Sequence, residues 1–405
     1  MKRLRLSLLT LSVSSLFMSQ TVFAAAFQLY ELGTPIIGTA GAGQAAVAND
    51  ASTTYFNPAG MTQFKNSQFM LGSQIVLPFT NFSKNNNNTI TGDNGGNAAT
   101  LIPGLDIYYI SNYSSKLKLG ISLTSPYGGM LNYTNGWVGR YVVQQMQMYT
   151  LDLNPTVAYQ INDWAAIGAG VTVEYANLQE TIAIPLIPLV DGQANVKLSN
   201  TAGGANLGFL FTPTPNTKLG VAYRSQISHR FTGNTTFLRI SDNPATTSRI
   251  IMPQNIMISL AQGVTNNFSI LGDLGWANWA SMRNTLVTID RYSIVTPLNW
   301  TNTYRVGLGG QYKATPLLLI QAGASYDSSP TTSSKRLPDL PMDRQLRIGT
   351  GVIYTVIPAV KLGFSYEYIN FGSAKINNTS SAGVLAGSYT RNYGNVLQAS
   401  INVAC

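Results

Sequence analysis

Several stretches of the chain alternate between apolar residues and polar or glycine residues with a period of two. In 361–371 (KLGFSYEYINF), Leu362, Phe364 and Tyr366 share one face, while Lys361 and Glu367 share the other. The stretches 304–312 (YRVGLGGQY) and 166–175 (AIGAGVTVEY) repeat this arrangement. Strands of this kind, apolar outside and polar or glycine-rich inside, are what the wall of a lipid-facing β-barrel requires.

The first 24 residues indicate export. Lys2, Arg3 and Arg5 precede an apolar run, and Val22-Phe23-Ala24 is a small-residue cleavage site, so we assign 1–24 as a signal peptide. Charged residues make up only 10% of the chain, and no apolar run of spanning length follows the signal. Backbone polar groups in lipid must be paired, and without helices only a closed barrel achieves this. The sequence therefore predicts a multi-pass protein of a Gram-negative outer membrane.

Fourteen segments carry the strand pattern, within an expected barrel domain of 66–405. Short connections such as 162–163 (ND) and 314–316 (ATP) alternate with long polar ones such as 81–100 and 328–341. This asymmetry around an even strand number is typical of bacterial outer-membrane barrels. A soluble β-sandwich is the alternative, disfavoured because export, low charge and loop asymmetry agree. The segments are 66–79, 101–111, 116–127, 143–161, 164–184, 196–212, 216–232, 254–265, 267–290, 300–313, 317–327, 342–356, 359–377 and 391–405.

The composition argues against several other classes of function. Cys405 and His229 are the only residues of their types, which leaves little material for a metal site, a cofactor site or a catalytic pair. We expect His229 to lie at a loop edge, near the outer end of 216–232. The positive charges are scattered, which argues against a nucleic-acid partner. The run 41–46 (GAGQAA) mimics a dinucleotide-binding fingerprint, but no strand precedes it. Cys405 also ends the last strand, where such barrels usually place an aromatic residue.

The segment in front of the barrel carries the most specific resemblance. The runs 25–33 (AAFQLYELG), 38–52 (GTAGAGQAAVANDAS) and 55–62 (YFNPAGMT) resemble the N-terminal hatch of the FadL family of outer-membrane transporters of long-chain fatty acids. Further stretches are similar to that family in order and spacing, and they cover nearly all of the mature chain: 120–128, 151–162, 276–282, 304–312, 322–330 and 337–344. The resemblance implies an all-β, 14-stranded antiparallel barrel plugged by a small hatch domain, residues 25–65.

Two short motifs follow from this reading. Asn57, Pro58 and Ala59 resemble the family's hatch motif, in which we expect a tight, non-regular turn packed against the wall. Proline fixes φ and lacks an N–H, and asparagine can bond nearby backbone groups. A simple connector into the first strand is the alternative.

The second motif is Pro126, Tyr127, Gly128 and Gly129, where proline removes a ladder donor and the glycines relax the backbone. The residues leave open a bend or a mere strand end. The resemblance implies an inward kink in the third strand that opens the lumen sideways to the membrane.

Three arginines, Arg224, Arg305 and Arg347, fall on inward faces by the alternation. Each could pair with a ligand carboxylate, for which the guanidinium fork is well suited. Mutual neutralisation is the other interpretation, and it is favoured for each arginine taken singly. The inward acids expected to do this are Asp152, Glu174, Asp273 and Glu367.

The resemblance implies passive transport of a hydrophobic small molecule, a fatty acid or a hydrocarbon. We expect capture at apolar outer stretches (128–141 and 182–190), a deeper lumen site, and sideways exit through the kink. The expected surroundings are outer-membrane lipid and lipopolysaccharide, with the protein a monomer. A general diffusion porin and a barrel lipase are the rival hypotheses; no enzymatic activity is expected.

Overall fold

The computed structural model describes residues 28–187, 190–238, 243–380 and 382–405, so the predicted signal peptide lies outside the described residues. Most of the regular structure in the described chain is β-strand. None of the helices in the described ranges is long and apolar enough to cross a membrane.

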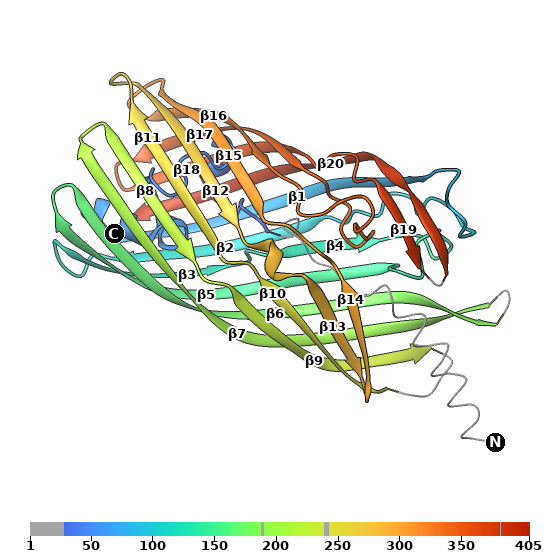
Figure 1. The fold of residues 1–405 in the computed structure, drawn as a ribbon. Coiled ribbons are helices and arrows are strands. Elements are labelled where there is room, and N and C mark those ends of the chain that lie inside the picture. Colours follow the sequence, from blue (N-terminus) through green and yellow to red (C-terminus); the bar gives the residue numbers. More distant parts are fainter. Residues whose placement is uncertain (1–27, 188–189, 239–242, 381) are drawn as a thin grey trace.

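The strands form one antiparallel sheet that closes on itself. The last strand pairs with the first in continuous register, from Gln68 opposite Ala404 to Asn81 opposite Arg391. The sheet contains twenty described strand segments, but six barrel strands are each interrupted once, which leaves the fourteen predicted strands. Figure 1 shows the resulting ring.

The uninterrupted barrel strands are β1 (Gln68–Lys84), β2 (Ile102–Ser111), β5 (Gln145–Asn162), β6 (Ala165–Ile187), β7 (Val190–Thr214), β16 (Leu318–Asp327), β17 (Gln345–Ile357) and β20 (Gly383–Ala404). The interrupted ones are β3 (Leu117–Thr124) with β4 (Gly128–Asn132), β8 (Thr217–Arg224) with β9 (Ile227–Leu238), β10 (Ala245–Met252) with β11 (Asn255–Gly263), β12 (Phe268–Ala277) with β13 (Asn284–Ile289), β14 (Tyr292–Pro297) with β15 (Thr303–Lys313), and β18 (Val360–Asn370) with β19 (Ile376–Ser380). The short helix η5 (Trp279–Ser281) separates β12 from β13.

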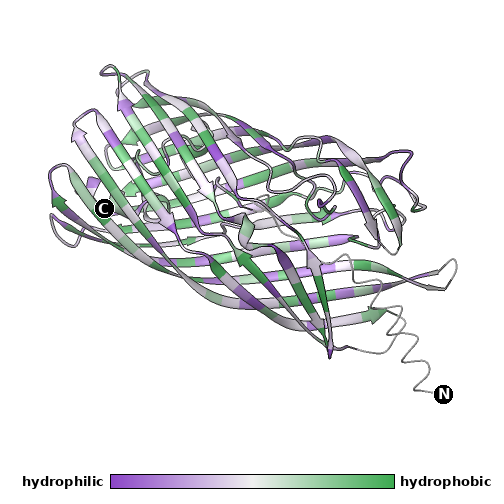
Figure 2. Cartoon of the chain, in the orientation of Figure 1, coloured by the Kyte–Doolittle hydropathy of each residue, from purple (hydrophilic) through white to green (hydrophobic). Residues whose placement is uncertain are grey.

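The predicted alternation is confirmed in the wall. Tyr304, Val306 and Leu308 are 55–65% exposed, whereas Arg305 between them is 3% exposed. Green and purple residues alternate along the strands in Figure 2 for the same reason. Exposed apolar side chains of this kind form the band that faces lipid.

Several segments expected to be loops are strands. Residues 182–187 extend β6, Gly128–Asn132 form β4, and both β10 and β14 lie in stretches predicted to be extracellular connections. Ile182 and Ile184 are 2% exposed and pack with Val287 and Ile289, so 182–185 is not an exposed apolar loop. The ladder continues past the membrane because its inward face still has an apolar cluster to bury.

The segment before β1 lies inside the ring of strands, where the blue ribbon coils in Figure 1. It contains η3 (Pro35–Thr39), α2 (Thr53–Phe56) and η4 (Pro58–Gln63), so the turn expected to be non-regular is in fact two short helices. We call residues 28–65 the hatch segment.

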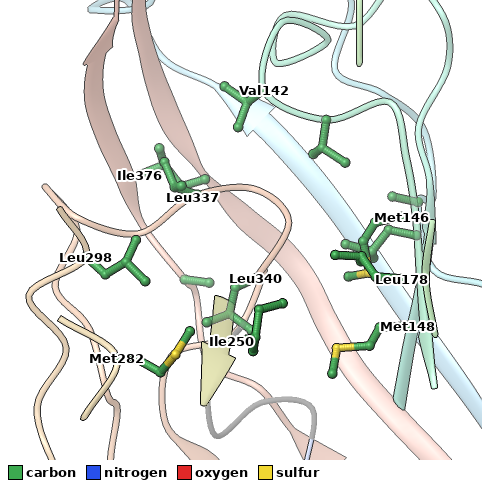
Figure 3. Packing of buried hydrophobic residues seen from close by; sticks show 14 of the residues in the cluster. Val142, Met146, Met148, Leu178, Ile250, Met282, Leu298, Leu337, Leu340 and Ile376 are labelled. Carbon is green, nitrogen blue, oxygen red and sulfur yellow. The ribbon is translucent and has the colours of Figure 1, made fainter. Parts of the chain in front are cut away.

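Apolar side chains fill much of the lumen beyond the hatch segment. One large cluster draws on the inward faces of several strands and on the long connections, including Trp137, Val138 and Leu340, each at most 1% exposed. Figure 3 shows part of it. Met146 and Met148 of β5 lie beside Leu178 of β6 on one side, and Ile250 of β10 lies on the other side. The outer half of the barrel interior is therefore apolar rather than aqueous in character.

Candidate functional site

The predicted Asn57-Pro58-Ala59 motif fastens the hatch segment to the wall. The Asn57 amide is fully buried and donates to the carbonyl oxygens of Ala45 (2.6 Å) and Phe209 (3.0 Å). Its Oδ1 accepts the backbone N–H of Ala59 at 3.1 Å and so caps η4. Phe209 belongs to β7, so one side chain ties two parts of the hatch segment to the barrel. The simple-connector alternative does not account for these bonds.

Glycines of the wall mark where the hatch segment touches it. A Cβ added at Gly168 of β6 would lie 2.5 Å from the nitrogen of Ala59, closer than real Cβ contacts come. The same crowding against hatch backbone occurs on four other strands, at Gly72, Gly220, Gly323 and Gly349, while Gly208 of β7 faces the Asn57 side chain. Close approach of two backbones requires glycine. The inward glycines seen in the alternation are thus a footprint of the hatch segment.

The third barrel strand is interrupted where the sequence predicted a kink. Residues 125–127 join β3 to β4, and β2 pairs with β3 only as far as Ile107 opposite Leu123. Contact with this neighbour resumes at Ala99 opposite Leu131. On the β2 side, pairing is therefore lost between Leu123 and Leu131, whereas on the β5 side the break is confined to 125–127, because Gly128 and Gly129 pair with β5 as part of β4.

The start of the hatch segment lies against this break. The N–H of Leu29 donates to the carbonyl oxygen of Pro126 at 2.8 Å, and Gln28 bridges Tyr127. On the β5 side, the hydroxyl of Ser125 donates to the carbonyl oxygen of Thr150 at 2.7 Å. Hydrogen bonds to the hatch segment and to β5 therefore replace part of the missing ladder.

Asp106 of β2 is a residue at this break that the sequence analysis missed. Its side chain is fully buried, and its Oδ1 accepts the N–H of Ser125 at 3.1 Å. Its other oxygen has no hydrogen-bond partner among the described residues. The alternation of the predicted strand 101–111 places position 106 on the inward face, and this pattern could have identified Asp106 as a candidate.

A small apolar cavity of about 70 Å³ opens beside the break. Glu31 and Arg347 lie at its polar end. Its apolar lining includes Leu29, Val76, Ile102, Leu131, Ile369 and Phe371.

Arg305 and Arg347 belong to one buried charge cluster. Asp327 bonds both guanidiniums, at 2.8 Å in the case of Arg305, and Glu31 of the hatch segment lies 3.5 Å from Arg347. Glu367 lies 3.9 Å from Arg347. The charge neutralisation expected from the sequence therefore occurs for these two arginines. Of the acids involved, the sequence analysis named Glu367 but not Asp327 or Glu31.

Tyr30 of the hatch segment lies over both guanidiniums, with its ring centroid 4.5 Å from Arg305 and 5.0 Å from Arg347. Burial raises the pKa of the Tyr30 phenol, so the ring stays neutral beside Asp327. Arg305 also donates to the carbonyl oxygen of Ala40. This cluster thus binds the hatch segment to β15, β16, β17 and β18.

Arg224, at the end of β8, lines a second small cavity of about 50 Å³ together with Tyr55, Trp276 and Arg305. Its guanidinium lies 3.5 Å from the centroid of the Tyr55 ring and 3.8 Å from Asp152. Its side chain is 16% exposed, against 2% for Arg305 and Arg347. Arg224 is therefore the most accessible of the three candidates.

His229 is not a loop-edge residue, contrary to the expectation. It points into the lumen from β9, is fully buried, and lies 2.9 Å from Glu174 of β6. The error arose because β9 continues well beyond the predicted end of its strand, so position 229 falls within the wall. The predicted inward orientation of Glu174 is confirmed.

Comparison with known proteins agrees with this architecture. The family model described as "Outer membrane protein transport protein (OMPP1/FadL/TodX)" matches residues 15–403. The long-chain fatty acid transport protein of Salmonella typhi is 24% identical, over 91% of this chain and 92% of that protein. A FadL homologue from Pseudomonas aeruginosa has the same fold, with a TM-score of 0.87 at 18% identity over 93% of this chain and 99% of that one. The Ralstonia pickettii toluene transporter TbuX gives 0.67 at 16% identity, over 93% and 100%. The chain therefore belongs to the OMPP1/FadL/TodX family of outer-membrane transport proteins.

Proposed function

We propose that this protein carries hydrophobic compounds passively across the outer membrane and releases them sideways into the bilayer. The observation that supports this most directly is the apolar cavity beside the break between β2 and the third barrel strand. Unpaired backbone in lipid costs several kcal/mol per group, so such a break persists only where protein or ligand lines it. A hydrophobic ligand in the cavity would lie next to that opening.

The hatch segment closes the direct route to the periplasm in this proposal. Its backbone lies against wall glycines of five strands, and Asn57 and the arginine cluster bind it at separate points. A general diffusion porin needs an open lumen, which this packing does not favour. Transport is downhill and needs no chemical step.

Entry would take place through the outer half of the lumen. The apolar cluster there includes Met146, Met148, Met282 and Leu340, and methionine side chains adapt readily to ligands of different shape. The stretch 128–141, expected to capture ligand, contributes Trp137 and Val138 to this cluster. We therefore place initial capture within the cluster rather than on exposed loops.

The names of the relatives include fatty acids and toluene, and we propose hydrophobic compounds of this range for the present chain. All three arginines line a cavity, and Arg224 is our candidate for a ligand carboxylate because its side chain is the most exposed of them. The charges of Arg305 and Arg347 are balanced by Asp327, Glu31 and Glu367, so we assign these arginines to holding the hatch segment.

The exit is tested by restoring the strand with Pro126→Val and Gly128→Val together. A Cβ at Gly128 meets nothing closer than 3.5 Å, so the barrel should still assemble and shift on gels when heated. We expect uptake of a radiolabelled fatty acid and of a neutral hydrocarbon to fall, while ligand binding to the purified protein persists. The control is Ser225→Val with Gln226→Val, at the interruption between β8 and β9. Wild-type uptake by an assembled Pro126/Gly128 variant would rule out this exit.

A further inference from the structure

Two arginines face each other on the outside of the barrel. Arg230 of β9 and Arg249 of β10 are directly paired in the antiparallel register, and both side chains are exposed. Their neighbours His229 and Ile250, also paired, are at most 1% exposed. Because side chains alternate across a strand, the two guanidiniums project from the outer surface.

Like charges directly opposite each other on a sheet destabilise the pairing. Within the described ranges, no carboxylate forms an ion pair with either guanidinium. Ser228 accepts the Nε–H of Arg249 at 3.0 Å, which orients that side chain along the β9 surface. The pair therefore presents an oriented set of N–H donors with no protein anion, which favours an anion supplied from outside.

The position along the strands indicates which anion is available. Tyr149 of β5 and Tyr175 of β6 are exposed, and their ring centroids lie 6.4 Å apart on the outer wall, on the long-loop side of the exposed apolar residues Leu151, Leu153 and Val157. Aromatic residues at the edge of the apolar band mark the boundary between hydrocarbon and headgroups. Tyr175 pairs with Thr201 of β7, and Ser199 of β7 pairs with Thr232 of β9, so Arg230 lies in line with Tyr175 across the sheet, on the long-loop side of the apolar band. It therefore lies at the level of the headgroups.

Hydroxyl groups surround the arginine pair on the same outer face. Thr232 and Thr247 are paired one step further out, and both are exposed. Thr247 also pairs with Thr288 of β13, and Thr232 with Ser199 of β7. Arginine binds phosphate through two parallel N–H bonds, and hydroxyls add further donors. The chemistry of this surface matches a phosphate group held between two strands.

We propose that Arg230 and Arg249 bind a phosphate of lipopolysaccharide in the outer leaflet. The lipid partner follows from the level of the pair on the outer wall, where its neighbours are outer-leaflet headgroups. The contact offsets the repulsion between the two guanidiniums and anchors the face formed by β9 and β10. It is separate from the lumen, so it does not depend on what the protein transports.

Native mass spectrometry of the purified barrel with added lipopolysaccharide tests this proposal. The variant is Arg230→Gln with Arg249→Gln, and the control is Arg291→Gln, an exposed arginine beside Asp290 on the turn before β14. We expect the double variant to lose at least about tenfold in affinity, because charge-assisted hydrogen bonds are lost, while the control keeps wild-type affinity. Lipopolysaccharide treated with a phosphatase should bind the wild type as weakly as it binds the double variant.

Two results would overturn the proposal. Equal binding of intact lipopolysaccharide by the double variant and the control would remove the arginines from the contact. Displacement of lipopolysaccharide by millimolar inorganic phosphate would show a site for free anions instead. Heat-modifiability of each variant on gels confirms that the barrel is assembled, and uptake assays should show unchanged transport.

Discussion

The wall glycines allow the contact between hatch segment and barrel to be tested without touching the hatch segment. Gly323 of β16 and Gly349 of β17 both face η3. A Cβ at position 323 would lie 2.6 Å from the carbonyl carbon of Thr39, and one at position 349 would lie 2.8 Å from the nitrogen of Ala40. Both are backbone atoms that no rotamer change can move away. The double change Gly323→Ala with Gly349→Ala must therefore displace η3 or bend the wall.

The expected magnitude follows from the cost of overpacking, about 1–3 kcal/mol per site. Because both sites act on one short helix, their effects are coupled, and about 2 kcal/mol is a conservative total. At about 1.4 kcal/mol per factor of ten, this raises the undocked fraction of the hatch segment about 30-fold. The matched control is Gly272→Ala on β12, whose Cβ would meet nothing closer than 3.8 Å.

Planar-bilayer recording gives the readout, since each undocking opens an aqueous path through the lumen. We expect conducting events to be about 30-fold more frequent in the double variant than in the Gly272→Ala control. Heat-modifiability on gels should be the same for both. Equal conductance from two assembled barrels would refute the inference that these glycines exist to admit the hatch backbone.

Three further outcomes are expected. Asn57→Ala removes three hydrogen bonds, at about 1 kcal/mol each, so protease should cleave the hatch segment far faster while the barrel stays intact; unchanged cleavage would contradict the fastening role. Arg224→Gln should weaken fatty-acid binding about tenfold and spare a neutral hydrocarbon, and equal effects on the two ligands would make Arg224 a wall residue only. Burial raises the pKa of Asp50 in the hatch segment, so the folded state binds more protons than the unfolded state above the ordinary pKa of aspartate. Docking should therefore weaken as pH rises through that window, and Asp50→Asn should flatten the pH dependence measured by protease cleavage.

Much of the site could be predicted because the alternation assigns each strand residue to the lumen or the lipid. It placed Arg224, Arg305 and Arg347 inside, and the structure has all three there. It could not say which acid pairs with which arginine. Asp327 lies on a neighbouring strand, and Glu31 comes from the hatch segment, so both pairings depend on how distant parts of the chain meet.

The ends of the strands were the least predictable part of the fold. The loss of alternating hydrophobicity suggested that strands stop at the membrane surface, but β9, β10 and β14 continue beyond it. There the inward faces still bury Phe231 and Ile250, while the outward faces are polar. The sequence of these segments therefore resembles that of a loop. His229 was misplaced for this reason.

The sequence by itself determined the class of structure, because a charge-poor chain without spanning helices can satisfy its backbone in lipid only as a closed barrel. It also determined the strand number, which depends on local periodicity. Proline and glycine chemistry marked 57–59 and 126–129 as special positions, but their roles in a hatch and an exit remain proposals. Only the tertiary structure decided what the inward glycines admit, which groups fill the break at 125–127, and where the cavities lie. Those features arise from contacts between residues far apart in the chain. The alternation pattern shows which residues point inward, but it does not show which inward residues contact one another.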